Sequence, residues 1–253
     1  MGIAGLCQRE NRKPSLWLRF AAYVILFALQ PVLAVCITGC ENVQGFTQDS
    51  MVRFMDASYN APPVDVLVAG ALIAGNVGQG SISNYALVPP NSAAKISITV
   101  SGTTTPLYSS YGTLLAGHEH TILLSDYNST YQIQVLEDQS TPAAGGHSAF
   151  RFLNQAPESG PVDIYMLPTG VTFAQAKAIY SALPVGQTTG YIEITSQTLS
   201  LVIVPTGTTT AMYQSTTAMQ LTGGEVKTVL IVDSQLTINP PIDVYIANDI
   251  PAE

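Results

Sequence analysis

Arg53-Phe54-Met55-Asp56 returns 98 residues later, without a gap, as Arg151-Phe152-Leu153-Asn154. Twelve residues after each arginine comes an aspartate, in Pro63-Val64-Asp65-Val66 and in Pro161-Val162-Asp163-Ile164. Short apolar segments rich in valine and isoleucine and bounded by turn residues are typical of β-strands. These two stretches therefore predict a β fold that is built twice.

Three more matches follow in the same order. They are Val77-Gly78-Gln79 with Val185-Gly186-Gln187, Gly102-Thr103-Thr104-Thr105 with Gly207-Thr208-Thr209-Thr210, and His120-Thr121-Ile122-Leu123 with Lys227-Thr228-Val229-Leu230. Ordered matches at similar spacing indicate a tandem duplication in which each copy is one structural unit.

Each copy has the pattern of an immunoglobulin-like β-sandwich. Residues 95–100 alternate between polar and apolar, which places one face in a core, whereas residues 199–204 are almost entirely apolar and suit a central strand. About seven short strands per 100 residues, separated by turns, is the sandwich pattern. The expected strands are 52–55, 64–68, 83–88, 95–100, 113–115, 120–124 and 131–136, then 149–153, 162–166, 191–195, 199–204, 219–221, 227–232 and 236–238.

Two segments stand apart from the repeat. The apolar side chains of residues 173–183 lie at helical spacing, which favours a short helix inserted in the second copy. Residues 241–245 repeat the Pro-x-Asp-Val-Tyr pattern and either close the second copy or begin a truncated third one. The organisation we predict is a signal peptide over 1–39, a tether over 40–50, sandwiches over 51–140 and 148–253, and a linker over 141–147.

The N-terminus is predicted to be an export signal. Four basic residues precede an apolar run over 20–35, which is the order of a secretory signal. Gln30 and Pro31 interrupt that run, which disfavours a membrane-spanning helix of about 20 residues. The run ends in Ile37-Thr38-Gly39-Cys40, which resembles a bacterial lipobox. The resemblance implies cleavage before Cys40 and lipidation of Cys40; an uncleaved anchor and an ordinary signal peptide are the alternatives.

The cysteines agree with this interpretation. Cys7, Cys36 and Cys40 are the only cysteines, so the predicted mature chain keeps Cys40 alone and has no disulfide framework. Acyl chains would hold the protein on a membrane, because each buried CH₂ contributes about 0.8 kcal/mol. Glu41, rather than an aspartate, follows Cys40, which in lipoprotein sorting favours the outer membrane. We therefore predict a lipid-anchored protein of the cell envelope, on the outer membrane or the cell surface.

Charge limits the classes of partner. The chain has 9 basic and 17 acidic residues; after residue 40 there remain 9 − 4 = 5 basic and 17 − 1 = 16 acidic residues, a net of −11. Nucleic acid selects basic faces, so we expect no nucleic-acid partner. Only 10% of residues are charged against 47% hydrophobic, which excludes a disordered chain.

Both copies share an opening Arg-Phe strand and an Ala-Pro step before Val-Asp, and the first copy also has Val-Pro before alternating isoleucines. The residues are Ala61-Pro62-Pro63-Val64-Asp65-Val66, Ala156-Pro157 with Val162-Asp163-Ile164-Tyr165, and Val88-Pro89 before Ile96 and Ile98. This combination resembles the bacterial domain-of-unknown-function 4397 family over about residues 50–240. The resemblance implies secreted or surface β-sandwiches, often in tandem on lipoproteins, and supplies no catalytic residues.

Two groups of residues are candidates for chemistry. His118 and His120 would share one face of a strand, but zinc needs three or four ligands and the only other histidine is His147 in the linker. We expect a solvated strand start there, with no metal and no cofactor. Asp65 and Asp163 are expected to cap bends. Arg53 and Arg151 are expected either to pair with these aspartates or to cover an apolar face with their aliphatic stems.

No enzyme class is indicated. The chain lacks Gly-x-Ser-x-Gly, Gly-x-Gly-x-x-Gly and a phosphate-binding loop.

We predict a non-enzymatic, lipid-anchored scaffold or binding module for an envelope protein or polymer, where two modules raise apparent affinity for a repeating partner. The alternative is a carbohydrate-binding module that uses tyrosine-rich loop ends at Tyr108, Tyr111 and Tyr213, because tyrosine offers a flat apolar face and a polar tip. A metal-dependent enzyme at His118 and His120 ranks third.

Overall fold

The computed structural model describes residues 47–126, 130–236 and 241–250. Residues 47–253 form one compact unit. The predicted signal peptide and the lipidation site Cys40 lie outside the described residues. Within the described ranges, no helix is both long and apolar enough to cross a membrane.

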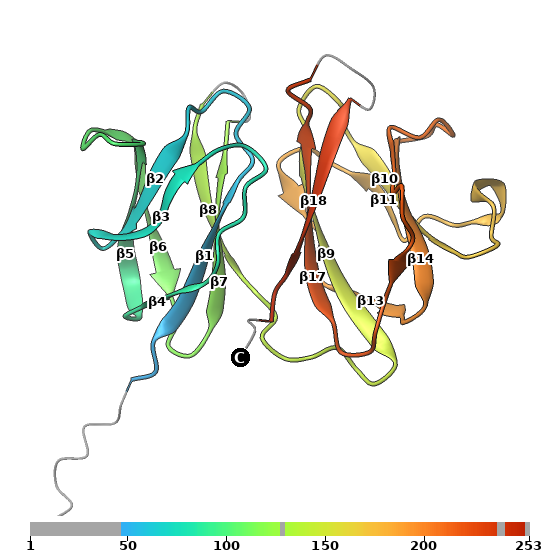
Figure 1. The fold of residues 1–253 in the computed structure, drawn as a ribbon, viewed down its shortest axis with the longest axis horizontal. Helices are drawn as coiled ribbons and strands as arrows, with labels where there is room; N and C mark the ends of the chain where they lie inside the picture. The colour runs from blue at the N-terminus through green and yellow to red at the C-terminus, as the bar shows by residue number, and fades with distance from the viewer. Residues whose placement is uncertain (1–46, 127–129, 237–240, 251–253) are drawn as a thin grey trace, which may run out of the picture. The chain divides into compact units, whose positions relative to one another are not determined.

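The first sandwich consists of two four-stranded sheets (Figure 1). One sheet has the order β4-β1-β7-β8 and the other β3-β2-β5-β6. Strands β1 and β7 run parallel, and the other neighbours are antiparallel. The strands are β1 (Ser50–Asp56), β2 (Val64–Val68), β3 (Ala71–Val77), β4 (Ala86–Val88), β5 (Asn91–Val100), β6 (Pro106–Leu114), β7 (Glu119–Ser125) and β8 (Gln132–Glu137).

The second sandwich repeats this plan with two five-stranded sheets. In one, β12, β9, β17 and β18 follow in order and β13 also pairs with β9; in the other, β11, β10, β14 and β15 follow in order and β16 also pairs with β14. Strands β9 and β17 are parallel, as β1 and β7 are. The strands are β9 (His147–Gln155), β10 (Val162–Pro168), β11 (Tyr180–Leu183), β12 (Gln187–Thr188), β13 (Ile192–Thr195), β14 (Thr198–Pro205), β15 (Tyr213–Gln214), β16 (Met219–Gln220), β17 (Val226–Asp233) and β18 (Ile242–Asn248).

The core of each sandwich lies between its two sheets, and strand alternation selects its residues. Phe54 of β1 and Ile122 of β7 pack into the first core, as Phe152 of β9 and Val229 of β17 pack into the second. Successive side chains of a strand point to opposite faces. The intervening residues of these four strands therefore face outward from each core, yet they too are buried.

These outward faces meet in a third apolar layer. Met55, Ala57 and Leu123 of the first sandwich pack with Leu153, Leu230 and Val232 of the second. Burial on both faces explains why β7, β9 and β17 carry few exposed positions. The structure confirms the all-β, sandwich-like fold class, and this shared layer puts both sandwiches in one compact unit.

Several strands were not expected from the sequence. They include β11, β12 and β15, and also β3, in which two alanines, a glycine and an asparagine dilute the strand signal of Ile73 and Val77. β6 was expected only over 113–115. Tyr108 and Tyr111 therefore lie within a strand, and the prediction that they occupy loop ends is wrong. Of the expected strand over 236–238, Leu236 is outside any strand and the other two residues lie outside the described ranges.

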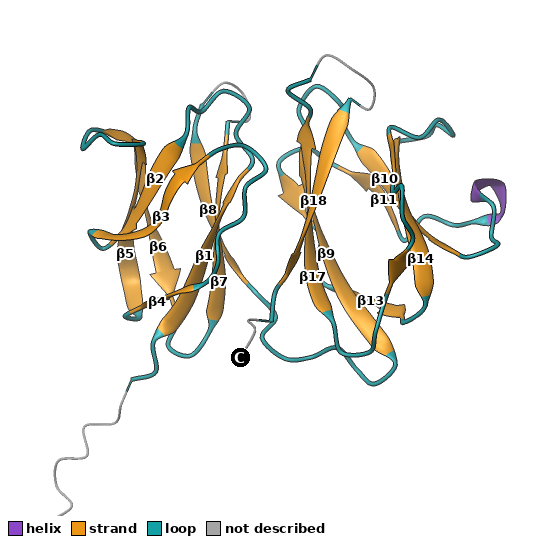
Figure 2. Ribbon diagram, viewed as in Figure 1, coloured by secondary structure: helices purple, strands orange, loops and turns teal. Residues whose placement is uncertain are grey.

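The predicted helix over 173–183 is also wrong. Only a 3₁₀ turn, η2 (Phe173–Gln175), forms there, and β11 follows it (Figure 2). Phe173 and Ala176 cover the outer face of β10 and β14, whereas Ile179, Tyr180 and Leu183 face the second core. The helical spacing arose because one segment supplies apolar side chains to two different layers.

The segment around residues 241–245 closes the second sandwich. β18 pairs with β17 along its whole length, as β8 pairs with β7. Of the two interpretations that the sequence left open, the closing strand is the one found.

Candidate functional site

The two duplicated arginines lie buried where the sandwiches meet, on the outward faces of β1 and β9. In each sandwich the arginine stands directly opposite a threonine on the parallel neighbour, Arg53 opposite Thr121 and Arg151 opposite Thr228. Both arginine side chains are at least 96% buried. A buried guanidinium needs partners for its donors, and strand register supplies the first of them.

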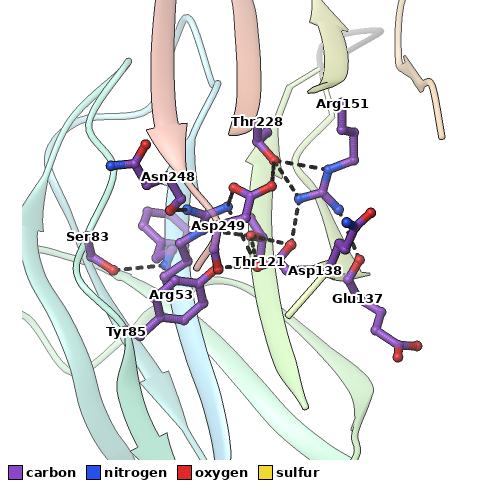
Figure 3. A network of polar contacts seen from close by, with 12 residues as sticks. Arg53, Ser83, Tyr85, Thr121, Glu137, Asp138, Arg151, Thr228, Asn248 and Asp249 are labelled. Atoms are coloured by element: carbon purple, nitrogen blue, oxygen red, sulfur yellow. Dashed lines mark hydrogen bonds and ion pairs between the residues drawn. The ribbon is translucent and has the colours of Figure 1, made fainter. Parts of the chain in front are cut away.

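Each arginine is paired with a carboxylate of the other sandwich (Figure 3). Arg53 Nη2 is 2.5 Å from Asp249 Oδ1, and Arg53 Nη1 donates to the carbonyl of Asn248 at 2.7 Å. Arg151 Nη2 is 2.5 Å from Asp138 Oδ1, and Arg151 Nη1 donates to the carbonyl of Glu137 at 3.1 Å. The exchange is reciprocal, as expected of a self-complementary contact between two copies of one surface.

The remaining bonds of each carboxylate come from its own sandwich. Asp138 accepts from Thr121 Oγ1 at 2.6 Å and from the Tyr85 hydroxyl at 2.7 Å. Asp249 accepts from Thr228 Oγ1 at 2.6 Å and from the Tyr191 hydroxyl at 2.6 Å. Each aspartate thus joins a threonine and a tyrosine of one sandwich to the arginine of the other.

The tyrosine rings complete the enclosure. Arg53 Cζ lies 4.8 Å from the ring centre of Tyr85, and Arg151 Cζ lies 4.9 Å from that of Tyr191, within the range of a cation–π contact. Burial raises the pKa of both tyrosines, so their hydroxyls stay protonated and donate. Burial also acts to lower the pKa of Arg53, but the charges of Asp249 and Asp138 outweigh it and the pKa is raised.

These eight residues form what we call the reciprocal cluster: Arg53, Tyr85, Thr121, Asp138, Arg151, Tyr191, Thr228 and Asp249. The expectation that the arginines pair with Asp65 and Asp163 is wrong, because their carboxylate partners are Asp138 and Asp249. Both aspartates follow the last strand of a sandwich, β8 or β18, and lie 111 residues apart rather than 98. The arginine period of 98 residues therefore does not reveal them.

Asp65 and Asp163 cap bends, as predicted. Asp65 accepts from the backbone N–H groups of Asn76 and Gly102, which lower its pKa, the latter most. Asp163 accepts from the N–H groups of Ala182 and Gly207. These carboxylates hold turns in place at corresponding points of the two sandwiches.

The ring centres of the two histidines lie 6.4 Å apart, but the two side chains have different hydrogen-bond partners. His118 precedes β7 and bonds Glu137 Oε1 at 2.7 Å, at the surface. His120 is buried, its Nδ1 lies 3.2 Å from Ser50 Oγ, and burial lowers its pKa. Across the described ranges, no group of three or more histidine, cysteine, aspartate or glutamate residues could hold a metal ion.

The predicted tyrosines are spread over both sandwiches. Tyr111 is 70% exposed on β6 and stands opposite Lys95, while Tyr108 is 37% exposed on the same strand. Tyr213 belongs to β15 and packs against the second core. The structure does not bring Tyr213 to the surface that carries Tyr111.

A groove of about 920 Å³ adjoins the reciprocal cluster. Arg53 and Tyr85 of the cluster line it, together with apolar and amide side chains from both sandwiches. The other lining residues are Met51, Ile82, Ser83, Asn84, Glu225, Val226, Ile246, Ala247, Asn248 and Ile250. Sequence reasoning missed this groove because its walls come from segments more than 130 residues apart.

The comparisons with known proteins bear on the first sandwich. Residues 50–165 match the family described as "Domain of unknown function (DUF4397)". The DUF4397 match begins with β1, covers the whole first sandwich and extends through β9 into β10. It includes Arg53, Tyr85, Thr121, Asp138 and Arg151 of the cluster. No curated protein matches the chain.

Proposed function

We propose that the chain is a non-enzymatic, lipid-anchored protein of the cell envelope that holds a protein or polymer partner near the membrane. The observation that carries the non-enzymatic part of this proposal is the reciprocal cluster, and the lipid anchor rests on the sequence around Cys40. The buried charges of the cluster all form hydrogen bonds or ion pairs that hold the two sandwiches together. These charged residues therefore have a structural role. A general acid or base needs a carboxylate or imidazole that can reach a substrate, and Asp138 and Asp249 are enclosed.

We also infer that residues 148–253 are a second copy of the DUF4397 domain. Arg151, Thr228, Tyr191 and Asp249 repeat the contacts that Arg53, Thr121, Tyr85 and Asp138 make within the matched residues. Two copies joined through a buried cluster present their outer surfaces at a defined spacing. Such spacing favours a partner with repeated features, because the second contact then forms at high effective concentration.

The anchor is tested by changing Cys40. Cys40→Ala should abolish acylation and move the protein from the membrane fraction to the soluble fraction. Cys36→Ala, four residues earlier, is the matched control and should leave the protein on membranes. Membrane sedimentation and acylation of the Cys40→Ala variant would contradict the lipid anchor.

The binding role is tested by in-cell cross-linking followed by affinity capture of the native and Cys40→Ala forms. A defined partner recovered with the anchored form supports an interaction module at the envelope. If neither protein nor envelope polymer is retained, the proposed binding role fails.

Carbohydrate binding is the second candidate, and the exposed face of β5 and β6 favours it. Tyr111 stands beside Lys95, and next to this pair Ser109 Oγ donates to Ser97 Oγ at 3.2 Å. A flat aromatic side chain beside hydroxyls can contact a sugar ring through both apolar and polar groups. Tyr111→Ala should then abolish retention on envelope polysaccharide, while Tyr213→Ala should not. Equal retention of both variants would contradict this site.

A further inference from the structure

The groove beside the cluster has a counterpart in the second sandwich, and that counterpart is covered. Met51 and Tyr85 line the groove; the residues at their positions in the second sandwich are Ala149 and Tyr191. Ala143, in the connection between β8 and β9, packs in one cluster with Ala149 and Tyr191 and is only 7% exposed. Among the described residues, the segment around Ala143 lies over one copy of this surface and none lies over the other copy. Val226 and Ile250 belong to the cluster that Ala143 covers and also line the groove.

The covering segment shows what fits such a surface. The Gln139 N–H donates to the Tyr191 hydroxyl at 3.2 Å, and the Ala143 N–H donates to the Gly224 carbonyl at 3.3 Å. Its sequence from 142 to 146 is Pro-Ala-Ala-Gly-Gly. Main-chain bonds and short side chains therefore hold it, which is how an extended peptide binds without deep pockets.

One wall of the groove is a sheet edge. β18 is the outermost strand of its sheet, and the Asp249 N–H donates to the Val226 carbonyl on β17 at 2.9 Å. Main-chain groups alternate in direction along an antiparallel strand, so those of Ile246 point away from β17. The Ile246 side chain is 39% exposed. An edge of this kind can accept an added strand.

The charges that line the groove are already paired. Arg53 is bound to Asp249, and Glu225 lies 3.4 Å from Lys227 Nζ. The remaining lining residues are uncharged. A peptide with charged side chains would have to give up hydration without gaining a partner here, which favours an uncharged occupant.

We propose that this groove binds an extended, uncharged peptide segment with short side chains, rich in alanine, proline and glycine, that belongs to a partner protein of the envelope. The proposal rests on the proposed function and names the chemistry of the partner. At the edge of β18 the main-chain groups of Ile246 supply hydrogen bonds, because the Asn248 carbonyl already accepts from Arg53. Met51, Ile82 and Ile250 contact the small side chains. Asn84 of the first sandwich also lines the groove.

The probe for the first experiment is a blocked, fluorescent peptide with the sequence of residues 139–146, titrated against the full chain in detergent and followed by fluorescence anisotropy. Saturable binding is expected. Asn84→Trp should weaken it by about tenfold or more, and so should Ile246→Ser. Gln214→Trp, on exposed β15, is the matched control and should not change it. No saturable binding, or equal affinity for Asn84→Trp and Gln214→Trp, would overturn the proposal.

The second experiment places a photo-cross-linking residue at position 84, or at position 214 as the control, in cells. An adduct formed only from position 84, mapped to an alanine- and proline-rich segment, supports the proposal. Adducts from position 214 but not from position 84 overturn the proposal of a peptide site in the groove, but they do not contradict the proposed binding function. No adduct from either position, with no partner in the capture experiment, overturns both.

Discussion

The two sandwiches have the same reciprocal cluster but differ at a buried polar position three residues after each arginine. Asp56 ends β1 in the first sandwich, and Asn154 takes its place on β9 in the second. Each accepts a bond from the backbone N–H two residues later, from Ser58 at 2.9 Å and from Ala156 at 3.2 Å. The two side chains have the same shape and differ only in the second terminal atom, which is Oδ2 in Asp56 and Nδ2 in Asn154.

The second terminal atom is hydrogen-bonded in Asn154 and has no hydrogen-bond partner in Asp56. Asn154 Nδ2 donates to the carbonyls of Gly160 and Leu183, both at 3.0 Å. Asp56 Oδ2 is buried without a hydrogen-bond partner. A carboxylate cannot donate, whereas a carboxylic acid can. Burial, with a smaller contribution from the charge of Asp126, raises the pKa of Asp56 to about 7, although the Ser58 N–H acts against this.

The comparison separates two kinds of residue. The arginine, threonine, tyrosine and aspartate of the cluster are the same in both sandwiches. Each arginine bonds the aspartate of the other sandwich, and the threonine and tyrosine bond the aspartate of their own. Asp56 and Asn154 each bond only within their own sandwich, and there the two residues differ. The residues that join the two sandwiches are therefore identical, whereas those at this position within each sandwich are not.

The largest effect is expected from the arginines. Arg53→Ala and Arg151→Ala should each lower the free energy of unfolding by about 3–5 kcal/mol, because each leaves a buried carboxylate without its cation. The two losses should agree within about 1 kcal/mol, since the partners are equivalent. Urea unfolding followed by circular dichroism measures both. Lys95→Ala, at an exposed lysine, is the control, and a loss below about 1 kcal/mol for either arginine would break the equivalence.

Asp56→Asn should stabilise the protein, and the gain should depend on pH. The folded-state pKa is raised to about 7 from 3.8, so the contribution of the acid form is fully present below pH 4 and is lost as pH rises through 7. At one pKa unit per 1.36 kcal/mol, the gain from asparagine should grow by about 4 kcal/mol between pH 4 and pH 8. Urea unfolding of both proteins across this range checks it. A difference that stays constant with pH would show that Asp56 does not titrate in this window.

Asn154→Asp is the reverse change. It removes two donors from the carbonyls of Gly160 and Leu183, so the variant should lose about 2–3 kcal/mol at pH 7. Acidification should restore part of that loss, because a protonated aspartate donates one of the two bonds. Thermal unfolding at pH 5 and pH 7.5 distinguishes the cases. Should the loss be equal at both pH values, the analogy between the two positions is wrong.

The tyrosines should give the smallest of these effects. Tyr85→Phe and Tyr191→Phe keep the ring over the arginine and remove one bond to a carboxylate, which costs about 1.5 kcal/mol. Each hydroxyl has a second contact, that of Tyr85 with the Asp249 carbonyl at 3.1 Å and that of Tyr191 with the Gln139 N–H at 3.2 Å, so the two losses should be similar. Chemical unfolding of both variants measures the losses, and a difference above about 1 kcal/mol would contradict this equivalence.

The sequence predicted the strands that alternate or are continuously apolar, and it predicted the caps at Asp65 and Asp163. It missed β3, in which alanine, glycine and asparagine dilute the strand signal, and the short strands β11, β12 and β15. It also missed most of β6, because Thr103–Thr105 and the tyrosines suggested a loop. The carboxylate partners of Arg53 and Arg151 could not be predicted from the sequence, for a different reason. Asp138 and Asp249 belong to the opposite sandwich, and spacing within one copy carries no information about a contact between copies.

The most direct test of this account is a double-mutant cycle between Arg53 and Asp249, measured by urea unfolding of the wild type, Arg53→Ala, Asp249→Ala and the double variant. Because the two side chains bond each other across the two sandwiches, the account predicts a coupling free energy of about 2 kcal/mol or more. Additive single effects, with coupling below about 0.5 kcal/mol, would contradict the reciprocal exchange of charges.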